Sequence, residues 1–242
     1  MAKNKFYAVK QGFDKEKNEV VSNLILTSWN ETASLVQGVN KKSHGIASEY
    51  KGFPTREEAE AFLQKDAPYI HKSDESYPKD ALHCYVDGSF SKEIGNYSYG
   101  LICVEGDKTV VHVDNGVGTN KDAIAMQQIG GELLGTIKAM LVAKKKKAKK
   151  VVVFFDYEGV ALHATGYWKR DNKFSETYYQ WMQKFFAENP DIEVTFCKVD
   201  AHTGDDFNEL ADGLAKLALD IEPDKMFYTL ANILKVPFVY SR

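Results

Sequence analysis

Four acidic residues of the 242-residue sequence stand within or directly after strongly apolar stretches. Asp87 follows the run Leu-His-Cys-Tyr-Val, and Asp156 follows Val-Val-Val-Phe-Phe, which are compositions typical of buried strands. Glu132 and Asp212 lie in segments whose apolar residues recur with helical spacing. Burying several like charges is prohibitive unless cations neutralise them. The four acids therefore predict one shared metal site.

The ligand type indicates which ions such a site would take. Ligands that offer only oxygen favour hard cations, and few carboxylates per ion leave room for water and a substrate phosphate around Mg²⁺ or Mn²⁺. Two ions about 3.5–4 Å apart could clamp the attacking and leaving oxygens of an in-line phosphoryl displacement. We therefore expect two Mg²⁺ ions per site, with Mn²⁺ as a possible replacement.

The composition, with 44% hydrophobic and 12% aromatic residues, is sufficient for a globular core. The formal net charge of −3 argues mildly against a nucleic-acid partner, although local patches matter more than the total. Cys84, Cys103 and Cys197 lie in strand-like runs, which favours buried, reduced thiols. No segment has the length of an uncharged membrane span, and residues 1–9 lack an apolar signal core. We expect a cytoplasmic monomer without a membrane partner.

The chain is predicted to begin with a small α+β domain of three strands, residues 1–63. Strand patterns occur at 5–10, 20–26 and 47–53. Helical patterns follow Ser28 or Asn30 and also Thr55, the latter with capping-box spacing. Residues 64–80 contain two prolines, scattered charges and little periodicity, so we interpret them as an exposed linker.

Residues 81–220 are predicted to form an α/β domain with a five-stranded mixed sheet and helices on both faces. Three closely spaced strand patterns predict an antiparallel meander, at 82–90, 97–104 and 109–113. Helical and strand patterns then alternate at 123–143, 151–156, 159–164, 176–187, 192–199 and 206–219. The lysine-rich stretch 144–150 suits a helix C-terminus. Residues 221–242 are interpreted as an extension of unknown role, with a helix at 228–234 and an extended segment at 236–240.

Residues 82 to about 219 resemble a type 1 ribonuclease H. The resemblance rests on four motifs in the family's order, namely Tyr85–Ser89, Gly131–Gly135, Phe155–Tyr157 and Ala201–Asp212. It implies a ribonuclease H-like fold and endonucleolytic cleavage of the RNA strand of an RNA–DNA hybrid, leaving a 5′-phosphate. Matched residue by residue, it implies five catalytic residues, the metal-binding acids Asp87, Glu132, Asp156 and Asp212 and the loop histidine His202. It also implies nucleic-acid contacts at Gly88, Ser89 and Gln128.

The N-terminal segment is similar to the hybrid-binding domain that often precedes this ribonuclease and that also occurs in caulimovirus viroplasmin. The similarity is carried by Phe6–Gly12, Ser28-Trp29, Tyr50–Phe53 and the helical pattern at 55–63. It implies that Tyr7, Trp29 and Tyr50 stack on sugars or bases and that Lys51 meets phosphate. Stacked rings beside a cation hold nucleic acid without reading its sequence. The implied partners are an RNA–DNA hybrid and also double-stranded RNA.

Three other classes of protein share part of this pattern. A proofreading exonuclease normally carries Asp-x-Glu on its first strand, whereas Asp87 is followed by Gly-Ser. A receiver domain needs an acidic pair on its first strand and a parallel sheet. A non-catalytic protein that binds hybrids or double-stranded RNA is the main alternative, because the acidic net charge matters less to it. The presence of all four acids favours the enzyme.

Overall fold

The computed structural model describes residues 5–64, 66–106, 108–170, 172–199 and 204–236. The chain divides into two compact units, residues 1–67 and 68–242. In the described ranges no helix is long and apolar enough to cross a membrane.

The first unit is a three-stranded antiparallel sheet with helices, as predicted. Its elements are β1 (Phe6–Asp14), β2 (Glu19–Leu26), α1 (Trp29–Val36), α2 (Lys41–His44), β3 (Glu49–Phe53) and α3 (Arg56–Gln64). The central strand is β1, and the order is β2-β1-β3. Ser28 caps α1 by accepting a hydrogen bond from the Glu31 N–H, which satisfies one of the free donors of the first turn. Val9 of β1, Val36 of α1 and Phe62 of α3 are buried in the unit's core.

The second unit contains a mixed sheet with the order β4-β9-β8-β5-β6-β7. Its strands are β4 (Ile70–His71), β5 (Leu82–Ser91), β6 (Asn96–Glu105), β7 (Thr109–Val117), β8 (Lys150–Phe155) and β9 (Glu193–Lys198). The predicted meander is present, because β5, β6 and β7 pair antiparallel, while β8 pairs parallel with both β5 and β9. The five expected strands are therefore confirmed, and the two-residue β4 adds a sixth at the edge beside β9.

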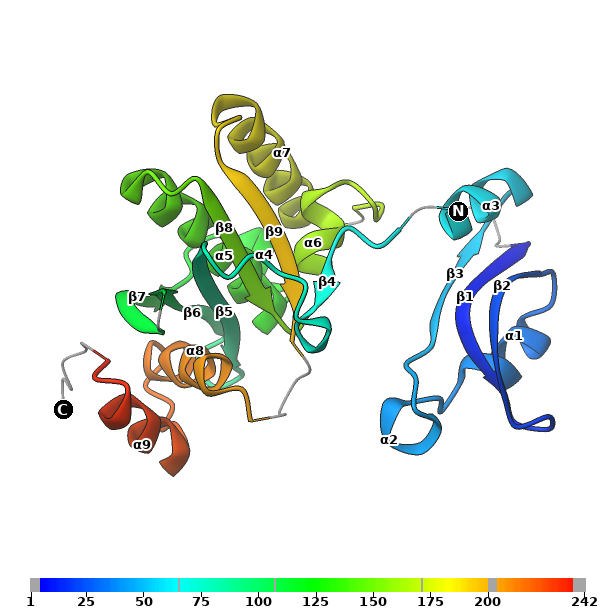
Figure 1. The fold of residues 1–242 in the computed structure, drawn as a ribbon, viewed down its shortest axis with the longest axis horizontal. Helices are drawn as coiled ribbons and strands as arrows, with labels where there is room; N and C mark the ends of the chain where they lie inside the picture. Colours follow the sequence, from blue (N-terminus) through cyan, green and yellow to red (C-terminus); the bar gives the residue numbers. More distant parts are fainter. Residues whose placement is uncertain (1–4, 65, 107, 171, 200–203, 237–242) are drawn as a thin grey trace. The chain divides into compact units, whose positions relative to one another are not determined.

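Helices cover both faces of this sheet (Figure 1). They are α4 (Lys121–Ile124), α5 (Gln128–Lys146), α6 (Gly159–Ala164), α7 (Lys173–Glu188), α8 (Asp206–Leu217) and α9 (Lys225–Ile233). Successive strand residues face opposite sides, so Cys84 and Val86 pack with α5, α6 and α7 in one core, whereas Tyr85 packs with α8 and α9 in the other. The helix predicted at 123–143 instead divides into α4 and α5, because Gln127 between them has a positive φ of 54°.

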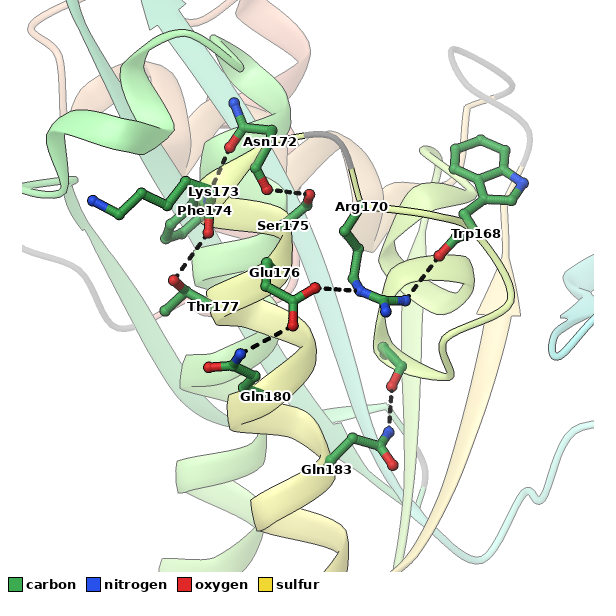
Figure 2. Close-up of polar contacts among 11 residues, drawn as sticks. Trp168, Arg170, Asn172, Lys173, Phe174, Ser175, Glu176, Thr177, Gln180 and Gln183 are labelled. Atoms are coloured by element: carbon green, nitrogen blue, oxygen red, sulfur yellow. Dashed lines mark hydrogen bonds and ion pairs between the residues drawn. The ribbon is translucent and has the colours of Figure 1, made fainter. Parts of the chain in front are cut away.

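The turn into α7 is held by a cluster of polar contacts (Figure 2). Asn172 caps the helix by accepting from the Phe174 N–H at 2.6 Å. The Arg170 guanidinium donates to the Glu176 carboxylate at 2.7 Å and to the Trp168 carbonyl at 2.9 Å. These bonds fix the connection between α6 and α7 to the first turn of α7.

Of the predicted linker 64–80, residues 68–80 belong to the second unit. Besides β4, this segment contains a 3₁₀ turn, η1 (Lys72–Asp74). The Tyr69 hydroxyl donates to Glu158 at 3.0 Å, and the Tyr77 ring meets Phe154 edge-on at a centroid distance of 5.1 Å. Lys72 donates to the Tyr85 hydroxyl and forms an ion pair with Asp205. The segment contains two tyrosines and one isoleucine among its polar residues. The apolar contacts of these three side chains attach the segment to the second unit.

The C-terminal segment is likewise part of the second unit up to Val236. Helix α9 begins at Lys225, and its Phe227 is 2% exposed and packs beside Gly213 of α8. The burial of Phe227, Leu230 and Ala231 shows that α9 completes the core on the α8 face. The extended segment predicted at 236–240 lies mostly outside the described residues. The three cysteines are free and buried, as expected.

Candidate functional site

Three of the four predicted acids meet at one end of the sheet. Asp87 lies in β5, and Asp156 directly follows β8, the parallel neighbour of β5. Glu132 lies in the second turn of α5 and is only 3% exposed. One carboxylate oxygen from each residue lies within 4.8 Å of the others. The expected pairing of Asp87 and Asp156 on adjacent central strands is therefore present.

Glycine residues allow the three acids to lie together, because the backbone of α5 lies in direct contact with the backbones of β5 and β6. A Cβ on Gly88 would overlap the Gln128 carbonyl and lie 2.8 Å from the Glu132 nitrogen. A Cβ on Gly131 would overlap the Ser98 carbonyl of β6. Two residues without side chains thus bring the first turns of α5 against the strands and place Glu132 beside Asp87.

The electrostatics of the cluster favour a bound cation. Burial, together with the negative charges of Asp156 and Asp212, raises the pKa of Asp87 well above its usual range. Burial and the charges of Asp156 and Asp87 raise the pKa of Glu132 in the same way. The Tyr157 N–H donates to Glu132 at 3.3 Å, which orients that carboxylate but does not neutralise it. Three close carboxylates with oxygen donors alone fit a hard divalent ion such as Mg²⁺.

The fourth acid, Asp212, approaches the same site from α8. A Cβ on Gly100 of β6 would overlap the Ala211 carbonyl, so this glycine lets α8 lie directly on the sheet. Asp212 is close enough for its charge to raise the pKa of Asp87. It does not belong to the group of three, and its carboxylate instead accepts a hydrogen bond from Lys216. The structure therefore shows three clustered acids and one neighbouring acid that is paired with a lysine.

The remaining residues predicted from the resemblance occupy different positions. Gly88 and Ser89 follow Asp87 on β5, and Gln128 is the first residue of α5, so all three lie near the acidic cluster. The N-cap residue Gln127 has φ 54° and ψ −132°, a strained conformation for a residue with a side chain. His202 lies outside the described residues.

In the first unit, the three predicted stacking residues form a continuous group of rings. The Trp29 ring centroid lies 5.5 Å from that of Tyr7 and 6.0 Å from that of Tyr50. Trp29 and Tyr50 are each 40% exposed, which is unusual for large rings of a small core. Lys51 follows Tyr50 on β3. With this exposure, Trp29 is not part of the buried core of the first unit.

The sequence interpretation missed Lys216 and Gly100. The spacing of four between Asp212 and Lys216 on a predicted helix was a usable signal for the ion pair. Gly100 had no such signal, because its role depends on which helix lies over that point of the strand.

The second unit thus combines a mixed sheet with three clustered carboxylates, of which Glu132 is buried and Asp87 and Asp156 are half-buried. The family model described as RNase H matches residues 79–220, and the model described as Ribonuclease H1 N-terminal domain matches residues 5–63. The first match alone spans more than half of the sequence, and the chain therefore belongs to the RNase H family.

Solved structures of similar chains include several ribonucleases H. RNase H1 from the archaeon Halobacterium salinarum is 21% identical, with a TM-score of 0.48 over 57% of this chain and 97% of that one. The N-terminal RNase H domain of a Mycobacterium tuberculosis protein is 20% identical, with a TM-score of 0.47 over 58% and 95%. LC11-RNase H1 in complex with an RNA/DNA hybrid is 17% identical, with a TM-score of 0.48 over 57% and 96%. No curated protein matches the chain.

Proposed function

We propose that this protein is an endonuclease that hydrolyses the RNA strand of RNA–DNA hybrids with two Mg²⁺ ions, or Mn²⁺ in their place. The observation that carries the proposal is the cluster of Asp87, Glu132 and Asp156 in a chain of the RNase H family. Asp87 and Glu132 have raised pKa values in the metal-free protein, which is the expected state of ligands without their cation.

Each residue would have a defined task. Asp87, Glu132 and Asp156 would bind the cations, and Asp212 would supply a further carboxylate ligand. Bound cations would lower the pKa of a water molecule and stabilise the charge that develops on the scissile phosphate. Attack by water rather than by the RNA's own 2′-hydroxyl would leave a 5′-phosphate and a 3′-hydroxyl. His202 would assist proton transfer or product departure.

Substrate binding would be shared between the two units. Gly88, Ser89 and Gln128 would contact the hybrid beside the acids, with Gln128 directed to its minor groove. Tyr7, Trp29 and Tyr50 would stack against the duplex, and Lys51 would meet a phosphate. Stacking and phosphate contacts have weak sequence preference. We also expect these contacts to form with double-stranded RNA.

The test is a gel assay with end-labelled RNA–DNA, RNA–RNA and DNA–DNA duplexes, with and without divalent cations. We expect cleavage of the RNA strand of the hybrid alone, only with Mg²⁺ or Mn²⁺, and with 5′-phosphate ends. Binding of the hybrid without cleavage under all metal conditions would instead support a non-catalytic hybrid-binding protein.

A further inference from the structure

Lys216 lies one helical turn after Asp212 on α8, and its Nζ contacts an Asp212 carboxylate oxygen. The side chains of the two residues are 30% and 24% exposed, so the pair is partly shielded from water. An acid followed four residues later by a base is the favourable order on a helix. The positive charge of Lys216 is therefore paired with Asp212, the acid that lies outside the cluster of three.

The charge of Lys216 also acts on the cluster. It lowers the pKa of Asp87, opposing the effects of burial and of the neighbouring carboxylates. A lysine is an ammonium ion at neutral pH, and the charge of Lys216 reaches two of the four acids, Asp212 by direct contact and Asp87 through space.

We propose that Lys216 competes with divalent cations for Asp212 and so makes the cation positions of this site unequal. No ion pair of a described lysine involves Asp87, Glu132 or Asp156, so an ion held by these three carboxylates has none of these lysines to displace. An ion that also uses Asp212 must take this carboxylate from Lys216 and tolerate the nearby ammonium. The inference rests on the proposed function and adds a specific residue that sets how much free metal is needed to fill the site.

A purely structural helix pair would behave differently. Lys184 and Glu188 form a pair with the same spacing but the reverse order on α7, at 3.7 Å; they are 73% and 53% exposed and lie in no acidic cluster of the described residues. Such a surface pair contributes little to stability and has no reason to affect cation binding. It provides a matched control for removal of a helical lysine.

The experiment is a Mn²⁺ titration of the full-length, metal-free protein, with free Mn²⁺ measured by electron paramagnetic resonance. The variants are Lys216→Met, Lys216→Gln, Lys216→Arg and the control Lys184→Met, and circular dichroism checks that each is folded. We expect two classes of site in the natural sequence. Lys216→Met and Lys216→Gln should tighten the weaker class about tenfold, because one positive charge near a divalent ion is removed.

The stronger class should change much less, and Lys216→Arg and Lys184→Met should both titrate like the natural sequence. An unchanged or weaker second class in folded Lys216→Met would overturn the inference, since Lys216 would then be neutral or would hold Asp212 ready for the ion. If the natural sequence bound no Mn²⁺ at all, the proposed two-metal function itself would fail. The two failures are therefore distinguishable in the same titration.

Discussion

Asp87 lies opposite Gly100 in the antiparallel pairing of β5 with β6. Cross-strand partners share a face of the sheet, so the absence of a side chain at Gly100 leaves space beside the Asp87 carboxylate. Helix α8 fills this space with its backbone at Ala211, one residue before Asp212. The distance between two of the acids is therefore set by a glycine on a third element.

This relationship predicts the effect of Gly100→Ala. The new methyl group would overlap the Ala211 carbonyl and lie 2.7 Å from the Ala215 nitrogen, so α8 must move away from the sheet. We expect a loss of about 1–3 kcal/mol in the free energy of unfolding, as for other overpacked sites, and a large loss of cleavage as Asp212 is displaced. Urea unfolding and cleavage rates measure the two effects.

Gly116→Ala is the matched control, because the three atoms nearest to its methyl group all belong to the Tyr99 side chain, the nearest at 3.2 Å. The Tyr99 side chain can move away from the new methyl group, whereas the Ala211 backbone cannot move without α8. Equal losses in the two variants would show that the packing of α8 at Gly100 has no special role.

Replacing Asp156 by Asn keeps the volume of the side chain and removes its charge. We expect the fold to persist and metal-dependent cleavage to fall by about 10³-fold or more, because ligand charge supplies several kcal/mol of transition-state stabilisation. Single-turnover rates on one hybrid, together with circular dichroism, provide the measurement. Undiminished cleavage by the variant would remove Asp156 from the metal site.

The acidic cluster predicts an unusual pH dependence of stability. Asp87 and Glu132 have higher pKa values in the folded, metal-free protein than in the unfolded chain, so folding takes up protons. Their contribution to stability is complete below about pH 4, the pKa of unfolded carboxyls, and is lost as pH rises through the raised values. The melting temperature of metal-free protein should therefore fall from acid to neutral pH relative to that of Asp87→Asn.

Added Mg²⁺ should restore the melting temperature of the natural sequence, and more at neutral pH than at pH 5, because a cation binds ionised carboxylates. Calorimetric melts at several pH values, with EDTA or with Mg²⁺, give both differences. Parallel pH profiles for the natural sequence and Asp87→Asn would contradict the raised pKa values.

The exposed rings of the first unit predict a stacking contribution to binding. In the full chain carrying Asp156→Asn, Trp29→Ala should weaken hybrid binding by about 1–3 kcal/mol. Tyr50→Ala should also weaken binding, whereas Tyr50→Phe should retain most of it because the ring remains. Fluorescence anisotropy at several salt concentrations measures affinity, which should fall as salt rises. If Trp29→Ala unfolds the first unit in circular dichroism, the ring is structural.

His202 is predicted to assist turnover without being indispensable. A histidine that exchanges protons near neutral pH typically contributes about 10²–10⁴-fold. His202→Ala should slow cleavage by a factor in this range and leave measurable metal-dependent activity, whereas Asp87→Asn should leave almost none. Steady-state rates for both variants on one hybrid decide the matter, since an equal, complete loss would make His202 essential and no loss would make it a bystander.

The sequence by itself determined the elements that carry the acids. The runs before Asp87 and Asp156 are buried on both faces and so appear as continuous apolar segments, and the helical periodicity around Glu132 and Asp212 follows from their one-sided packing. The motifs from which Tyr7, Trp29 and Tyr50 are predicted to be stacking residues are likewise local. These features depend on neighbours along the chain, which a sequence displays directly.

Only the tertiary structure decided which of these residues meet. The docking of residues 68–80 through Tyr69 and Tyr77, and the burial of α9 through Phe227, depend on contacts with residues far away in sequence. The sequence predicted one shared site for all four acids. In the folded structure Asp212 lies outside the cluster of three and is paired with Lys216. The physical reason is that the interaction between two charges depends on the distance between them in space. The distances between these acids are fixed by the backbone contacts of Gly88, Gly100 and Gly131.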